Sequence, residues 1–470
     1  MKEAIHILRY GTVGDKEHLF KARESFHYLA VNANSAAYVS GSIAQYVVEC
    51  LVKPNRGYFI DPLTHAFQKN INLLNSKTKN KEERIKKSIE KLLEYYQEPA
   101  SNVRKNIPIR ISDFNNDSLD YQDFCKRVLD FQFNIIYDNL EKGNIGQYVA
   151  YSLGVDLEDA SQIRPKFLVA PYFYLDVYDK EFGEWLKINK KFITCAKHQG
   201  EAYLATPIFG QIVISRETLL SEEGLQAVID SYSDSICDGF TVWVDGLDEH
   251  DASTDELTQF VKLLKGLKSK SNKKIYNLYG SYFSVLLTHR SLNLLNGVSH
   301  GLEYGESRQV FPVGGGIPTS KYYMFPLHKR LDFTQAFYLL KHHNVLDLFQ
   351  DNWGPATKYH NEVCNCNQCK KILKNEMINF MDFESTEFYE IVTKYSVVRR
   401  KKASTETKRN CLYHYLNSKA KEFSDVSKLK IEDLLLNMEK EKDNYVGCPE
   451  IDESALEYIY SWIKVLRSCL

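Results

Sequence analysis

Three cysteines stand within six positions in the segment Cys364-Asn-Cys366-Asn-Gln-Cys369. Thiolates bind Zn²⁺ at about 2.3 Å, and a structural zinc ion takes four ligands arranged as a tetrahedron. One tight turn can supply three of these ligands, so the fourth must come from elsewhere in the chain. The chain has ten cysteines and no secretion signal, which favours a metal site over disulfides. We therefore predict a zinc site.

Three residues are candidates for the fourth ligand: His414, Cys411 and His360. His414 lies in the segment NCLYHYLNSKAKEF, which is typical of a helix, and a helix packed on the turn can direct one ring nitrogen at the metal. We predict that His414 completes a closed, structural site. A catalytic zinc with an open position is the alternative.

The segment from 364 to 414 is basic in a chain whose net charge is −1. It carries ten Lys or Arg against six Asp or Glu, and the residues from 399 to 402 are all basic. Local segregation of this kind is what a phosphate backbone selects, although charge runs are usually solvated surface. The segment is therefore a candidate nucleic-acid surface.

Two aspartates end apolar segments that are typical of strands. Asp61 ends GYFID, and Asp245 ends FTVWVD. A pair of carboxylates can divide nucleophilic and proton-transfer roles between them. An aspartate at a strand end is more commonly a turn residue. We predict that Asp61 and Asp245 are the catalytic pair, because the ends of several strands can meet at one site.

Eight apolar segments are expected to be strands, and helical patterns lie between them. The strands are expected at 4–10, 26–33, 57–61, 166–176, 202–210, 239–245, 273–280 and 297–305. Helices are expected at 221–236 and at 254–270, the second with Ser253 or Thr254 as its N-cap. The alternation predicts a (β/α)₈ barrel, in which functional groups lie at the C-terminal strand ends. A doubly wound sheet is the rival, and it is weakened because no GxGxxG follows the first strand.

The rest of the chain predicts three further parts. An all-helical insertion is expected at about 70–160 within a barrel of residues 1–350, followed by a zinc-binding subdomain at 351–425. A helical segment at 426–470 could dock on the core or on a second subunit. The run 312–323 carries three glycines and then Ser320 and Lys321 but is no Walker A loop; it is either a loop closing over substrate or a crossover turn.

Composition limits the class of protein. Of the 470 residues 44% are hydrophobic and 26% are charged, which is ordinary for a globular chain and excludes disorder as the main state. No apolar run is long enough for a membrane span or a signal peptide, so we expect a cytoplasmic protein that does not bind membranes.

The cysteine turn followed by a helical histidine, late in a barrel-like chain, resembles the tRNA-guanine transglycosylase family. The segments AYLATPIFG, DGFTVWVDGLDE, KKIYNLYG and GVSHGLEYGESR are similar to the later strands of that family in order and spacing. The resemblance implies a zinc-containing (β/α)₈ barrel that exchanges guanine in a polynucleotide for a 7-deazaguanine base, such as 7-cyano-7-deazaguanine.

The chain departs from the family at two places. The family's nucleophilic aspartate falls on Leu302, with Glu303 adjacent, and its Asp-Ser-Gly-Gly-Phe-Gln signature is replaced by Asp-Pro-Leu-Thr-His-Ala-Phe from Asp61 onward. These features look more like the divergent, DpdA-type branch that inserts 7-deazaguanines into DNA. That branch implies DNA as the partner and an ATP-hydrolysing helper. A tRNA substrate and a non-catalytic nucleic-acid-binding barrel are the alternatives.

The resemblance also implies roles for individual residues. It makes Asp61 the general acid/base or base-recognising group, with Asp245 as the expected nucleophile and with Glu303 and Glu306 as rivals. We expect Glu303 and Glu306, with His300 and Arg308 of the same segment, to bind substrate.

Overall fold

The structure is a computed structural model. It describes residues 4–11, 15–48, 56–77, 83–115, 120–141, 151, 163–270, 273–302, 305–311, 320–346, 354–392 and 396–470. Within them, no helix combines the length and the apolar character that crossing a bilayer requires.

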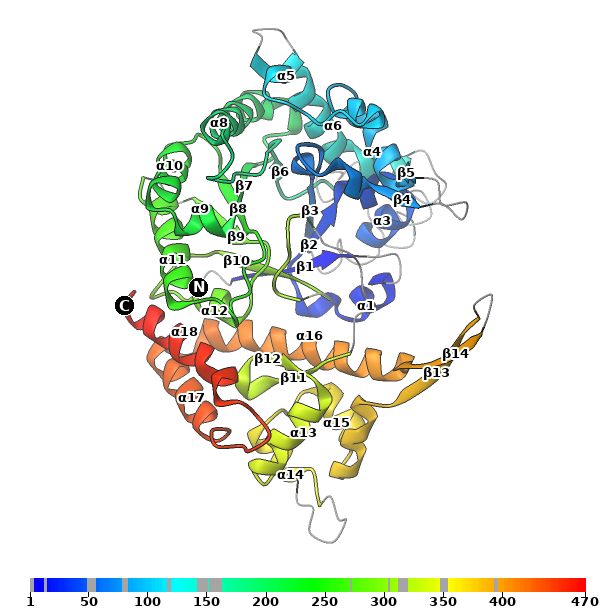
Figure 1. The fold of residues 1–470 in the computed structure, drawn as a ribbon, viewed down its shortest axis with the longest axis vertical. Coiled ribbons are helices and arrows are strands. Elements are labelled where there is room, and N and C mark those ends of the chain that lie inside the picture. Colours follow the sequence, from blue (N-terminus) through cyan, green and yellow to red (C-terminus); the bar gives the residue numbers. More distant parts are fainter. Residues whose placement is uncertain are drawn as a thin grey trace.

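Eight parallel strands form a nearly closed barrel surrounded by helices (Figure 1). Their order around the sheet is β3-β2-β1-β10-β9-β8-β7-β6. The backbone N–H of Lys166, just before β6, donates to the carbonyl of Tyr58 in β3 at 2.8 Å, and this bond bridges the two edge strands. The predicted barrel class is thus confirmed. The strands are β1 (Ile5–Tyr10), β2 (Tyr28–Asn32), β3 (Gly57–Asp61), β6 (Leu168–Val169), β7 (Ile208–Ile214), β8 (Gly239–Val244), β9 (Lys274–Asn277) and β10 (Gly297–Gly301).

The strands are apolar on both faces because one face lines the barrel and the other meets the helices. Inside, Phe167 stacks between Phe59 and Phe209, with ring centroids 4.4 and 4.1 Å apart, and Tyr276 stacks on Phe209 at 5.5 Å. The neighbouring residues in sequence, such as Tyr58, pack outward in the larger core. The barrel is therefore filled with side chains, which leaves its rim as the place for a candidate site.

Two of the predicted strands differ from the structure. The segment predicted at 202–210 begins as a 3₁₀ helix (Gly200–Tyr203), and β7 starts only at Ile208, because Leu204 and Ala205 take positive φ angles of 54° and 55°. The segment predicted at 166–176 pairs regularly only at Leu168–Val169. Pro171, which has no backbone N–H, follows two residues after Val169.

The helices around the barrel begin and end near the predicted positions. Ser253 caps α11 in a capping box with Glu256, as the sequence indicated. The helices are α1 (Asp15–Lys21), α2 (Ala33–Tyr38), α3 (Ser40–Val47), α4 (Lys87–Tyr96), α5 (Ser112–Asn115), α6 (Asp120–Glu141), α8 (Phe182–Gln199), α9 (Arg216–Leu220), α10 (Glu222–Ser233), α11 (Thr254–Lys268) and α12 (Tyr282–Leu286).

The prediction of an all-helical insertion at 70–160 is wrong in part. A short antiparallel hairpin, β4 (Asn75–Lys77) and β5 (Glu83–Ile85), interrupts it. Helix α6 also belongs to the barrel's own helical layer, because the Gln132 side chain exchanges two hydrogen bonds with the backbone of Val169, at 2.8 and 2.9 Å. Residues 78–82, 116–119, 142–150 and 152–160 of this segment lie outside the described residues.

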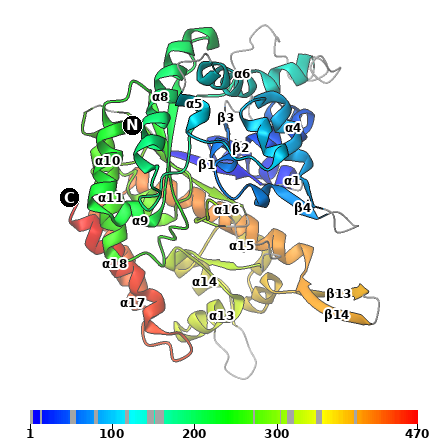
Figure 2. The same ribbon diagram turned by 45° about the horizontal axis from the view of Figure 1, so that its top comes forward.

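The C-terminal part packs below the barrel in Figure 1, with the long helix α16 between the two. The β13–β14 hairpin projects away from the body in Figures 1 and 2. The predicted boundary at 350 lies outside the described residues, so the division into domains stays a prediction. The elements are β11 (Tyr322–Met324), β12 (Lys329–Leu331), α13 (Phe333–His342), α14 (Thr357–Glu362), α15 (Asn367–Leu373), β13 (Thr386–Val392), β14 (Val397–Ala403), α16 (Thr405–Lys428), α17 (Ile431–Asp443) and α18 (Glu457–Arg467).

The tail helix α18 docks on the core of its own chain, which was one of the two alternatives for 426–470. The indole N–H of Trp462 donates to the carbonyl of Glu249 at 2.8 Å, and Trp462 is fully buried. The Tyr458 hydroxyl donates to the carbonyl of Leu327 at 2.5 Å. The tail therefore joins the barrel to the β11–β12 hairpin.

Candidate metal centre and barrel-rim site

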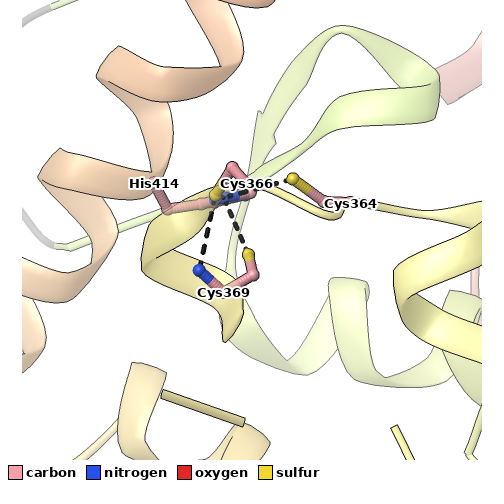
Figure 3. Close-up of side chains that lie close together, drawn as sticks. All are labelled: Cys364, Cys366, Cys369 and His414. Atoms are coloured by element: carbon pink, nitrogen blue, oxygen red, sulfur yellow. Dashed lines mark hydrogen bonds between the residues drawn. The ribbon is translucent and has the colours of Figure 1, made fainter. Parts of the chain in front are cut away.

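Four predicted ligands converge where α15 meets α16 (Figure 3). His414 Nδ1 lies 3.8, 3.6 and 3.2 Å from the sulfurs of Cys364, Cys366 and Cys369, and all four atoms lie within 4.8 Å of one another. A tetrahedral site with metal–sulfur bonds of about 2.3 Å and a metal–nitrogen bond of about 2.1 Å has sulfur–nitrogen edges of about 3.6 Å. The cluster is therefore compatible with one metal ion.

Local structure explains this arrangement. Cys366 is the N-cap of α15, and its sulfur accepts a hydrogen bond from the backbone N–H of Cys369 at 3.4 Å. His414 Nε2 donates to the carbonyl of Tyr323 at 2.7 Å, which leaves Nδ1 directed at the sulfurs. The Tyr322 ring stacks on His414 with centroids 4.9 Å apart. These contacts orient the imidazole before any ion binds.

The protonation of the cluster also favours a cation. Hydrogen bonds from Cys364 and Cys369 lower the pKa of Cys366, whereas burial raises the pKa of Cys369. Burial lowers the pKa of His414, but the charge and hydrogen bond of Cys364 raise it to about 10. When no ion is bound, the proton on His414 therefore balances thiolate charge in this buried site, and a divalent ion would take the place of that proton.

The other two candidate ligands lie outside the cluster. The Cys411 sulfur donates to the carbonyl of Phe383 at 3.5 Å, and His360 Nδ1 lies 3.1 Å from the carbonyl oxygen of Cys364. The structure therefore brings His414, and neither of these residues, to the three cysteines.

Asp61 lies at the C-terminal end of β3 and is completely buried. Its Oδ1 accepts a 2.7 Å hydrogen bond from the Tyr172 hydroxyl, and its Oδ2 lies 3.2 Å from Nη2 of Arg9. Nη2 of Arg9 also donates to Asn32 at 2.8 Å. The ends of β1, β2 and β3 therefore place a buried, ion-paired carboxylate at the rim.

Arg9 is the residue that sequence reasoning missed. It is only 5% exposed, and its guanidinium stands over the Tyr279 ring at 4.6 Å. Its Nη1 is buried and has no hydrogen-bond partner among the described residues. The sequence does contain a sign of this role. Arg9 lies inside the apolar segment AIHILRY, and a charged side chain buried with such a strand needs a polar or charged partner.

Asp245 follows β8 and is half-buried. Its Oδ1 accepts a 2.7 Å hydrogen bond from the backbone N–H of Val310, and its Oδ2 accepts one from the Tyr174 hydroxyl at 3.0 Å. Burial raises the pKa of Asp245 despite these bonds. Tyr172 and Tyr174 stand two residues apart on one segment, so this segment holds both predicted carboxylates.

Two further side chains complete the rim. Arg308 Nη1 donates to the Tyr279 hydroxyl at 3.2 Å, and the Arg308 carbonyl accepts from the Trp243 indole at 3.0 Å. His65 Nδ1 lies 2.9 Å from the Tyr172 hydroxyl, and burial lowers the pKa of His65 to about 4. The predicted residue Arg308 therefore lies near Asp61 and Asp245, and His65 is an additional neutral group there.

His300 and Glu306 lie elsewhere, between the barrel and α16. On β10, Val298 and His300 face outward, and His300 Nε2 lies 2.7 Å from Nε2 of His6. The Glu306 carboxylate pairs with Lys419 at 2.6 Å. Both side chains belong to the buried interface between the barrel and α16. Their predicted role in substrate binding stays a prediction. Glu303 lies outside the described residues.

No family model matches this sequence, and no curated protein matches it.

Proposed function

We propose that the protein is a transglycosylase that exchanges guanine in DNA for a 7-deazaguanine base, such as 7-cyano-7-deazaguanine. One observation carries the proposal: Asp61, paired with Arg9, and Asp245 both lie at the C-terminal rim of the barrel, and tyrosines of one segment hold them. The sequence resemblance supplies the reaction class, and the rim supplies two carboxylates in different environments.

The two carboxylates divide the reaction. Asp245 attacks C1′ of the deoxyribose and displaces guanine, so that the C1′–N9 bond breaks as a C1′–carboxylate ester forms. The nitrogen of the incoming base then attacks C1′ and displaces Asp245. Guanine gains one proton as it leaves, and the incoming base loses one proton as its nitrogen bonds to C1′. Asp61 donates the first proton and accepts the second, so the exchange needs no net proton.

Arg9 supplies recognition of the base. Its Nη2 is engaged by Asn32 and Asp61, whereas its buried Nη1 donor has no partner among the described residues. A buried donor without an acceptor costs free energy, so a bound ligand that supplies an acceptor is favoured. The O6 and N7 atoms of guanine are acceptors that guanidinium groups bind well. We assign Nη1 to an acceptor on the bound base.

Zinc fits the Cys364, Cys366, Cys369 and His414 donor set, because three sulfurs and one imidazole favour tetrahedral Zn²⁺. All four positions are taken by protein ligands, so the proposed role is structural. The ion would hold α15 against α16 and so fix the C-terminal part beneath the barrel.

The test is base exchange by the purified full chain. Labelled 7-cyano-7-deazaguanine is supplied with single-stranded DNA, supercoiled DNA or tRNA, and the products are identified by mass analysis of nucleosides. Single-stranded and supercoiled DNA are chosen because they reduce the need for a helper that opens the duplex. Incorporation into DNA is expected. Incorporation into tRNA alone would end the DNA assignment, and binding without exchange would favour the non-catalytic alternative.

Variants test the residues. Asp245→Asn and Asp61→Asn are expected to lower exchange by at least a factor of about 100, in line with the loss of a positioned acid–base or nucleophilic group. Asp230→Asn is the matched control, because Asp230 is an exposed aspartate on α10 that accepts a hydrogen bond from Gln226. Full activity in both rim variants would refute the residue assignment.

A further inference from the structure

A cavity of about 140 Å³ opens beside the end of β10, where α16 meets the β11–β12 hairpin. Four of its side chains are lysines or arginines, and its lining includes no aspartate or glutamate. In a chain with net charge −1, four cations around one small cavity are a marked segregation of charge. Its lining residues are His18, Leu302, Ser320, Lys321, Arg330, Thr405, Lys408, Arg409, Cys411, Leu412 and Tyr415.

Helix α16 supplies one wall through its first turns. Thr405, Lys408, Arg409 and Leu412 are spaced at i, i+3, i+4 and i+7, so they share one face of the helix. The wall lies near the positive end of the helix dipole, which adds to the field of the side chains. His414 faces the cysteines from the same helix, so the metal cluster sets the position of this wall.

Arg330 of β12 supplies the opposite wall. Its Nη2 donates to the carbonyl of Leu302 at 3.0 Å, and its guanidinium stands 3.6 Å over the ring of Tyr415. The Tyr415 hydroxyl in turn donates to the carboxylate of Glu306. The negative charge of Glu306 partly offsets the positive charge of Arg330. Arg409 lies close enough to the exposed Glu17 to help lower the pKa of that carboxyl, whereas Lys321 and Lys408 form no salt bridge within the part of the chain that the structure describes.

Ser320 and Lys321 follow the three-glycine run that the sequence singled out, and both line this cavity. A hydroxyl and an ammonium group beside two further cations are donors that suit a phosphate group. Thr405 of α16 adds a second hydroxyl to the lining. The lining thus combines charge with hydrogen-bond donors.

We infer that this cavity binds a phosphate group of the polynucleotide backbone, next to the nucleotide that exchanges its base. Leu302 of the cavity directly follows β10, and the same segment continues to Arg308 at the rim. Arg409 also lines a neighbouring groove of about 760 Å³, where Lys21, Lys371 and Lys374 alternate with Glu24, Asp382 and Glu406, so the strong excess of basic side chains belongs to the smaller cavity. The choice of a polynucleotide rests on the proposed function, whereas the phosphate chemistry rests on the cavity alone.

The experiment measures binding of a fluorescein-labelled oligonucleotide by anisotropy at several salt concentrations. Lys408→Gln and Arg409→Gln are compared with wild type and with Lys265→Gln, an exposed lysine on α11 that serves as the control. Each lost phosphate contact lowers the slope of log K against log salt by about 0.9 on duplex or about 0.7 on single strands. We expect that reduction, and roughly threefold or greater loss of affinity, for the two cavity variants only.

Other outcomes separate the possibilities. Equal salt slopes in all four proteins would overturn the inference. If inorganic phosphate or a mononucleotide raises the melting temperature of wild type and not of Lys408→Gln, while the slopes stay equal, the cavity takes free phosphate and the backbone assignment is wrong. Reduced slopes in a protein without base exchange would refute the proposed function and leave the phosphate site standing.

Discussion

Lys419 of α16 and Glu306, which follows β10, form an ion pair with both side chains buried. Nζ lies 2.6 Å from Oε1, and the side chains are 1% and 7% exposed. Lys419 also lies 3.0 Å from Glu422, which in turn meets His328 of the β11–β12 hairpin at 2.7 Å. The helix that carries His414 is thereby joined to the barrel through charge as well as through apolar packing.

Replacing Lys419 by methionine should destabilise the protein by about 3–5 kcal/mol, because two buried carboxylates lose their counter-ion. The free energy of unfolding is measured by denaturant titration. Lys421→Met on the same helix is the control, since Lys421 pairs with Asp425 at the surface and should change stability by less than about 1 kcal/mol. Equal losses in both variants would contradict this role.

The pH dependence of stability should change sign in the same variant. Burial raises the pKa of Glu422, but Lys419 and His328 lower it to about 2, against an ordinary value of 4.5. In wild type this contribution is present above pH 4.5 and is lost as the pH falls toward 2. In Lys419→Met the pKa of the unpaired carboxylates should rise, so stability should fall as the pH rises toward neutrality. Unfolding measured between pH 2 and 8 covers both windows and distinguishes the two slopes.

Purified protein should contain about one zinc ion per chain. Cys366→Ser and His414→Ala should each lose the ion and lower the melting temperature, because the energy of binding at a structural site contributes to folding. Cys411→Ser is the matched control, since this nearby buried cysteine lies outside the cluster. Metal analysis decides the case, and unchanged zinc in both cluster variants would refute the site.

Tyr174→Phe should move the acid limb of the base-exchange rate to higher pH. Burial raises the pKa of Asp245, and the Tyr174 hydroxyl lowers it through a 3.0 Å hydrogen bond. A nucleophilic carboxylate must be ionised, so activity falls as the pH drops through this pKa. Tyr203→Phe, which removes a hydroxyl bonded to Asp130 away from the rim, should leave the profile unchanged. An acid limb that does not move would show that Asp245 is not the titrating group.

Arg9 and Asp61 should be coupled in stability. Arg9→Met alone should cost about 3–5 kcal/mol, because it leaves the buried Asp61 unpaired. The Arg9→Met/Asp61→Asn double variant should recover part of that loss, with a coupling energy of about 0.5–3 kcal/mol. Denaturant titration of the four proteins measures the cycle, and additive losses would show that the pair is not coupled.

The sequence alone determined those features that depend on local pattern. Continuous apolar segments predicted the barrel strands, and the spacing of Cys364, Cys366 and Cys369 predicted a turn that wraps an ion. The capping residue Ser253 predicted the start of α11. Each of these follows from the geometry of a few neighbouring residues, which the sequence displays directly.

Only the tertiary structure decided which distant residues meet. Of three candidate fourth ligands, the packing of α16 on α15 selects His414. The outward face of β10 carries His300 to α16 and away from Asp61, and Arg9 reaches Asp61 because β1 and β3 flank β2. Long-range pairing depends on how strands and helices pack, and a one-residue shift in register reverses the face of every side chain. A linear pattern therefore predicts the elements, and their packing decides the site.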